Sequence, residues 1–137
     1  MLFEQRELMT SPLNRYLQDS VNTASPGKLL VMLYDRLVLD LTLGEEALRT
    51  GDRELANDKL NHAQEIILEL RTTLNVESWA GAPGLASLYG YLLTELIGAN
   101  IARDADRVAT CRGHIEPLRD AWREAALLAA ANPAPVA

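Results

Sequence analysis

The sequence predicts an all-α protein: an antiparallel four-helix bundle preceded by a short N-terminal helical arm. Of the 137 residues, 25 are leucine and 19 are alanine, both strong helix formers, and only 5% are aromatic. Apolar residues recur every three or four residues along four segments, which is the spacing of a helix with one apolar face. The connections between these segments are short, so neighbouring helices are expected to run in opposite directions.

The chain divides into three expected parts. Residues 1–24 are predicted to form a mobile arm or lid, in which Ser11-Pro12 interrupts any helix and residues 14–21 make one short helical piece. Residues 25–131 are predicted to form the bundle, and residues 132–137 a flexible tail.

The first long helix is predicted over residues 26–50. Ser25 is a good N-cap, and Pro26 suits the first helical position, where its missing N–H costs nothing. Gly51 is a typical residue at which a helix ends.

Two further helices are predicted over residues 53–74 and 83–102. Asp52 can cap the first of them, and Pro83 can occupy the first position of the second. The stretch 75–84 between them contains two glycines and one proline, which is typical of a loop.

The fourth helix is predicted over residues 105–131, with Asp104 as its cap. Pro117 lies inside it, and an internal proline removes one backbone hydrogen bond and clashes with the preceding turn. Together with Gly113, it predicts a bend or a break near residues 113–117. Eight residues of the four apolar stripes are expected to be buried: Leu33, Leu37, Ile66, Leu70, Leu92, Leu96, Ile115 and Trp122.

The charge balance makes nucleic acid a poor candidate partner. There are 13 basic and 19 acidic residues, a formal net charge of −6, whereas phosphate binding depends on clustered Lys and Arg. The apolar runs are far shorter than the ~20 residues that cross a bilayer, so no membrane insertion is expected. A single cysteine, Cys111, cannot form an internal disulfide. These features indicate a soluble cytoplasmic protein.

No motif in the sequence predicts catalysis, a cofactor or a metal site. His62 precedes Glu65 by three residues, the reverse of the Glu-x-x-His order of di-iron bundles, and is expected to be an ordinary surface residue. Cys111 and His114 are two potential ligands where a structural zinc site takes four, so a core cysteine and a surface histidine are expected. The arginines of the fourth helix alternate with acids, which indicates a solvated ion-pair face, with a docking edge for an acidic partner as the alternative.

One long segment resembles a known family. Residues 14–35 read NRYLQDSVNTASPGKLLVMLYD, similar to the opening of the flagellar secretion chaperone family, FliS. Residues 88–91 and 118–122 are similar to the Leu-Tyr-Asp-Tyr and Leu-Arg-x-Ala-Trp stretches of that family. Gly90 stands where the family has Asp, Arg36 where it often has Gly, and Pro117 is not typical of it. The matches cover residues 13–125.

The resemblance implies a function in binding rather than catalysis. FliS proteins are antiparallel four-helix bundles, which agrees with the fold predicted from the residues. The family implies a cytoplasmic export chaperone that binds the disordered C-terminal segment of flagellin in apolar grooves. Such a chaperone prevents premature polymerisation and helps to deliver flagellin to the flagellar export gate.

The resemblance also suggests candidate partner-binding residues. The arm residues Leu13 and Tyr16 match the family positions that fold over part of the groove, and Val21 follows them in the sequence. The alternative is that Tyr16 only attaches the arm to the bundle. In the bundle, the candidates are Leu30, Tyr34, Leu37, Ile66, Leu70 and Tyr89.

Two other functions remain as alternatives at this point. The same apolar stripes would suit a structural or adaptor four-helix module that assembles with itself, for instance as a homodimer, without a flagellin client. A ferritin-like metal enzyme is disfavoured, because the sequence lacks its ligand motif.

Overall fold

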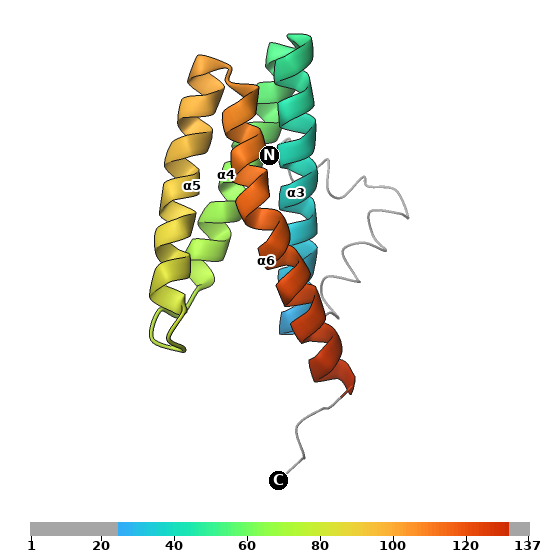
Figure 1. The fold of residues 1–137 in the computed structure, drawn as a ribbon, viewed down its shortest axis with the longest axis vertical. Helices are drawn as coiled ribbons and strands as arrows, with labels where there is room; N and C mark the ends of the chain where they lie inside the picture. The colour runs from blue at the N-terminus through green and yellow to red at the C-terminus, as the bar shows by residue number, and fades with distance from the viewer. Residues whose placement is uncertain (1–24, 132–137) are drawn as a thin grey trace, which may run out of the picture.

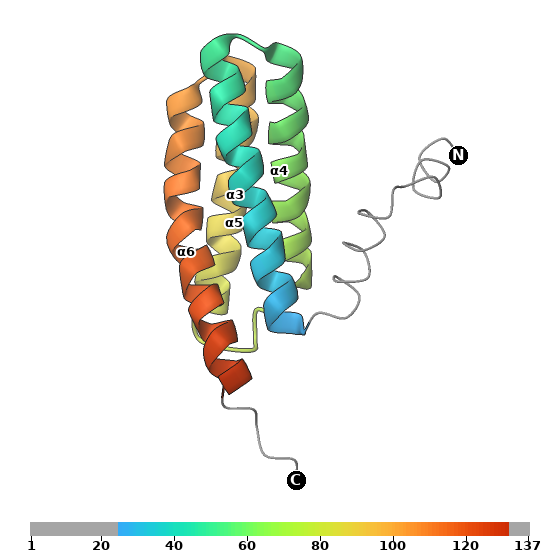
Figure 2. The same cartoon turned by 90° about the vertical axis from the view of Figure 1, so that its right-hand side faces the viewer.

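The computed structural model describes residues 25–131, which form four long α-helices. They are α3 (Pro26–Thr50), α4 (Arg53–Thr73), α5 (Ala82–Ala102) and α6 (Ala105–Ala131). Each helix runs antiparallel to the one before it, and the four pack side by side in one bundle (Figures 1 and 2). The predicted all-α bundle is confirmed. The predicted arm and tail lie outside the described residues.

The predicted helix ends are confirmed at three caps. The Ser25 side chain accepts a hydrogen bond from the backbone N–H of Lys28, and Asp52 accepts one from Leu55. Asp104 accepts one from Arg107 at the start of α6. Gly51 ends α3 at φ 82°, a left-handed conformation that glycine adopts without steric cost.

The core contains the predicted apolar stripes. Six of the eight residues expected inside are buried, and Leu33 and Trp122 are partly buried and pack against the core. Helices α3 and α4 come close together at Gly44, where an added Cβ would lie 2.7 Å from Leu60 Cδ2. A glycine is therefore required for this approach, because Leu60 is itself fully buried.

Of the predicted bend or break near residues 113–117, the break does not occur, because α6 is continuous from Ala105 to Ala131. Pro117 removes the N–H that would bond the carbonyl of Gly113, and both residues are exposed. The unpaired carbonyl thus lies on the solvent side, where water can satisfy it. Figure 1 shows that α6 does change direction, running upright beside α5 at first and slanting away in its second half.

None of the four described helices combines the length and the apolar character that crossing a bilayer requires.

Candidate interaction surface

Most of the predicted partner-binding residues of the bundle lie in its interior. Leu30 is partly exposed, whereas the other five are buried. A buried side chain offers no surface to a partner, so in this conformation these five support the bundle: Tyr34, Leu37, Ile66, Leu70 and Tyr89. The other three candidates, Leu13, Tyr16 and Val21, lie outside the described residues. Client contact by any of the nine stays a prediction.

The two buried tyrosines form a polar pair inside the core. The hydroxyl oxygens of Tyr34 and Tyr89 lie 2.5 Å apart, and burial raises the pKa of both phenols. Trp122 packs edge-on against Tyr34 with ring centroids 6.5 Å apart, and Trp79 packs against Trp122 at 6.3 Å. This aromatic row links the α4–α5 loop to α6 and α3.

Several incompletely buried apolar side chains lie at the end of the bundle where α3 begins and α6 ends. We call the apolar side chains there the open-end surface; they come from the start of α3, the end of α4, the start of α5 and the last turns of α6. Its partly buried members are Leu30, Leu33, Leu74, Leu88 and Trp122, and its exposed members are Leu127 and Leu128. A pocket of about 320 Å³ lies between α3 and α6 there, lined by Lys28, Val31, Arg123 and Leu127 among others.

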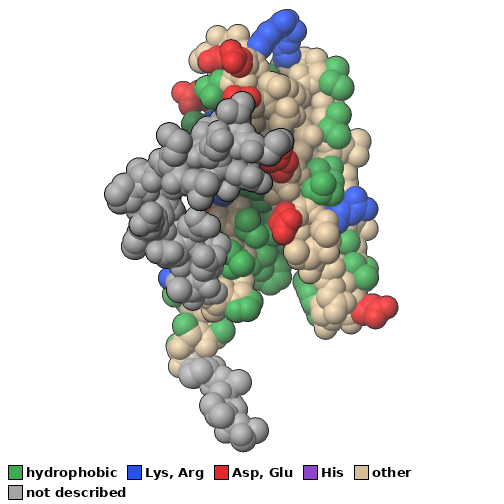
Figure 3. Space-filling view, turned by 180° about the vertical axis from the view of Figure 1, so that it is seen from behind, with side chains coloured by type: hydrophobic (Ala, Val, Ile, Leu, Met, Phe, Trp, Pro, Cys, Tyr) green, Lys and Arg blue, Asp and Glu red, His purple; other side chains and the backbone are tan. Residues whose placement is uncertain are grey.

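The space-filling view in Figure 3 shows apolar side chains in the same half of the molecule. Seen from behind, hydrophobic side chains gather in a hollow in the lower half of the described part (Figure 3). Leu127 and Leu128, on the last turns of α6, are 66% and 58% exposed. Apolar side chains gathered on an exposed surface are typical of a protein-binding site.

A buried carboxylate was missed by sequence reasoning. Asp40 is fully buried, and its Oδ2 pairs with Nδ1 of His62 on α4. Arg36 Nε lies 3.4 Å from the other oxygen, without the geometry of a hydrogen bond. His62 is therefore more than the ordinary surface residue expected. The available signal was the position of Asp40 within the leucine stripe of α3.

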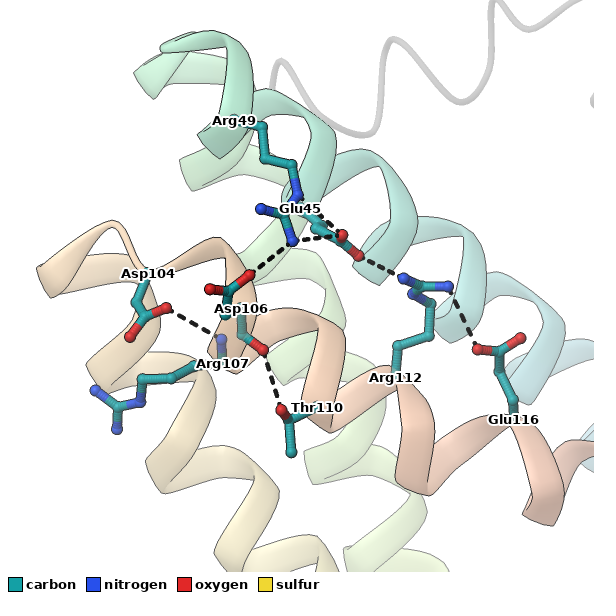
Figure 4. Close-up of polar contacts among 8 residues, drawn as sticks. All are labelled: Glu45, Arg49, Asp104, Asp106, Arg107, Thr110, Arg112 and Glu116. Atoms are coloured by element: carbon teal, nitrogen blue, oxygen red, sulfur yellow. Dashed lines mark hydrogen bonds and ion pairs between the residues drawn. The ribbon is translucent and has the colours of Figure 1, made fainter.

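Ion pairs cover the face between α3 and α6 (Figure 4). Glu45 accepts hydrogen bonds from Arg112 at 2.6 Å and from Arg49 at 3.0 Å, and Arg49 also reaches Asp106 at 3.0 Å. Partial burial alone would raise the pKa of Glu45, but its two arginines outweigh burial and lower it. The predicted ion-pair face is confirmed. Docking of an acidic partner on it stays a prediction.

The described residues hold no group of three or more potential metal ligands. Cys111 is a core residue, as expected, and burial raises the pKa of its thiol to about 11. His114 is exposed and packs edge-on against Tyr91, with ring centroids 6.0 Å apart.

The fold is that of bacterial flagellar chaperones. A solved structure described as the crystal structure of a flagellar chaperone from bacteria matches it with a TM-score of 0.68. The match covers 82% of this chain and 93% of the other at 23% sequence identity, a likeness that shows the fold. The family model described as "Flagellar protein FliS" matches residues 9–129. The chain therefore belongs to the FliS family of flagellar secretion chaperones.

Relatives in several bacteria support this membership. The flagellar secretion chaperone FliS of Bacillus subtilis is 38% identical over 84% of this chain and 86% of its own length. The FliS proteins of Campylobacter jejuni and Salmonella typhimurium are 30% and 29% identical over 81% and 79% of this chain. Their matches cover 88% and 82% of their own lengths.

Proposed function

We propose that the protein is a cytoplasmic export chaperone that binds the disordered C-terminal segment of flagellin. By holding this segment it prevents premature polymerisation and helps to deliver flagellin to the flagellar export gate. The observation that carries the proposal is the family match over residues 9–129, together with the 38% identity to a flagellar secretion chaperone.

The open-end surface gives this function a physical basis. A disordered segment loses conformational freedom when it binds, so it needs apolar area to bury in compensation. Burying one leucine side chain is worth about 1.5 to 3 kcal/mol. Leu127 and Leu128 are exposed in the described chain and can contribute this energy to a client without first leaving the core.

The residues before Ser25 are proposed to act as a lid that competes with the client. They connect directly to the start of α3, which lines the pocket between α3 and α6. Tyr16 carries a ring that can fill an apolar pocket and a hydroxyl that can stay hydrated. If arm and client share one surface, the arm lowers the apparent client affinity by the fraction of time for which it is docked.

The first prediction tests the client and its surface together. The full chain, co-expressed with the C-terminal segment of flagellin, is expected to elute as a soluble one-to-one complex. Leu127→Glu combined with Leu128→Glu is expected to weaken the complex at least about tenfold in calorimetric titration, because two apolar contacts are lost. Leu39→Glu is the matched control, since Leu39 is 47% exposed on α3 away from the open end.

Two results would count against this proposal. A chain that forms stable homodimers and does not retain the flagellin segment would favour the self-assembling module. A complex weakened equally by Leu39→Glu and by the α6 variant would show that the open-end surface is not the binding site.

A second prediction concerns the lid. Amide hydrogen exchange over residues 13–21 is expected to become faster when a flagellin C-terminal peptide is added, because the client displaces the arm. Slower or unchanged exchange would contradict displacement and favour an arm that clamps the client from outside.

A further inference from the structure

A second pocket lies at the opposite end of the bundle, where α3 ends, α4 begins and α5 ends (Figure 1). It has a volume of about 350 Å³. Its walls combine two arginines, two asparagines and apolar side chains, and none of the lining residues is acidic: Leu48, Arg53, Ala56, Asn57, Asn100, Ile101 and Arg103. We call this the turn-end pocket.

The two arginines of this pocket have no carboxylate partner among the described residues. Elsewhere in the described chain, ion pairs occupy six arginines: 36, 49, 107, 112, 119 and 123. Arg53 and Arg103 take part in none of these pairs, although the protein carries a net charge of −6. Arg71 also makes no described ion pair, but Arg53 and Arg103 share the lining of one pocket.

Of the acids next to these arginines in the sequence, exposed Glu54 makes no described ion pair and does not line the pocket, whereas Asp52 and Asp104 cap helices. Asp52 caps α4 through the N–H of Leu55 at 3.1 Å. Asp104 caps the N–H of Arg107 at 3.2 Å, and Asp106 pairs with Arg49 at 3.0 Å. These three carboxylates bond helix ends and the α3–α6 face rather than Arg53 or Arg103, so the guanidinium donors of both arginines can bond an external anion.

The backbone at Arg103 gives an independent observation. This residue ends α5 at φ 55° and ψ 45°, the only non-glycine residue with positive φ among those described. Glycine is the usual residue at this position after a helix, because a Cβ is strained there. An arginine at a strained position that glycine would relieve indicates a use for its side chain.

The polar and apolar walls together specify the ligand class. Asn100 Nδ2 donates to Asn57 Oδ1 at 3.0 Å. The side-chain N–H groups of Asn57 have no described acceptor and can donate to a ligand. Ile101 is 79% exposed, the largest exposed fraction among the large hydrophobic residues described. A bare inorganic anion would use the donors and leave Ile101 in water, whereas a peptide with adjacent acidic and apolar side chains would use both.

We propose that the turn-end pocket binds a short acidic peptide segment of a partner protein. A carboxylate of the partner contacts Arg53 and Arg103 and accepts from Asn57, while a neighbouring apolar side chain covers Ile101. Arginine suits this role because its planar fork matches the two oxygens of a carboxylate. The site is separate from the open-end surface and leaves that surface available to a client.

The proposal is tested on the ¹⁵N-labelled full chain by titration with the capped tetrapeptide Leu-Glu-Glu-Leu. Saturable amide shifts are expected around Arg53, Asn57 and Ile101, and they are expected to weaken as salt screens the charges. The capped peptide Leu-Gln-Gln-Leu and inorganic phosphate are the comparison ligands. Equal shifts with the glutamine peptide would contradict carboxylate recognition, and equal affinity for phosphate would contradict a peptide site.

Variants separate binding from folding. Arg103→Gly is expected to weaken peptide binding about tenfold while its melting temperature is unchanged or higher, because glycine relieves the strained backbone. Arg53→Gln is expected to weaken binding similarly. Arg71→Gln, at the other end of α4, is the matched control and is expected to bind like the parent.

Unchanged affinity in Arg103→Gly and Arg53→Gln would overturn the proposal. No flagellin is present, so the outcome does not depend on the proposed client.

Discussion

His62→Leu is expected to lower the free energy of unfolding by about 3 kcal/mol. Asp40 is fully buried, and His62 is the only described residue that hydrogen-bonds its carboxylate. Removing one partner of a buried pair leaves an uncompensated charge, which typically costs about 3 to 5 kcal/mol. We expect the lower end of this range, because the His62 side chain is 41% exposed and Arg36 remains 3.4 Å from Asp40.

The double variant Asp40→Ala with His62→Leu gives the contrasting result. It removes the charge and its partner together and keeps the combined side-chain volume similar. Replacing a buried pair by apolar groups is often neutral or stabilising, so we expect most of the lost stability to return. Urea unfolding would measure both variants.

His114→Leu is the matched control for this pair of variants. His114 is exposed and its ring only packs edge-on against Tyr91, so the change is expected to stay within about 0.5 kcal/mol. If His62→Leu behaved like His114→Leu, the Asp40–His62 pair would have no structural importance.

Local sequence patterns predicted the helices and their ends because those features depend on nearby residues. Ser25, Asp52 and Asp104 each bond a backbone N–H three residues ahead, an interaction that the sequence alone specifies. The spacing of the apolar residues likewise placed Leu37, Leu92 and Ile115 in the core. Each of these predictions needed only one helix at a time.

The candidate site was harder to predict because it depends on how the helices pack together. Tyr34 and Leu30 lie four residues apart on the same stripe, yet Tyr34 is buried and Leu30 is partly exposed. The stripe does not show where the helices diverge at the open end. It also does not show that Asp40 on α3 faces His62 on α4, since this pair joins residues 22 apart in sequence.

Pro117 shows how tertiary position modifies a local rule, because α6 changes direction without breaking (Figure 1). Its expected cost assumes a lost hydrogen bond that nothing replaces. Because Pro117 and Gly113 both face solvent, the carbonyl can bond water and α6 stays continuous. Which face of the helix carries the proline decided the outcome.

Tyr34→Phe and Tyr89→Phe are each expected to lower the free energy of unfolding by about 2 kcal/mol. The two hydroxyls are 2.5 Å apart in the core, and each single change leaves the other hydroxyl buried with its main partner removed. A buried polar group without a partner costs about 1 to 3 kcal/mol.

The double variant removes both hydroxyls, so its stability is expected to lie within about 1 kcal/mol of the parent. The resulting non-additivity, measured by urea unfolding, is the coupling energy of the pair. Tyr91→Phe, at a 47% exposed tyrosine on the same helix as Tyr89, is the control and is expected to change little. Additive losses in the double variant would contradict a direct bond between the two hydroxyls and indicate that each is satisfied independently.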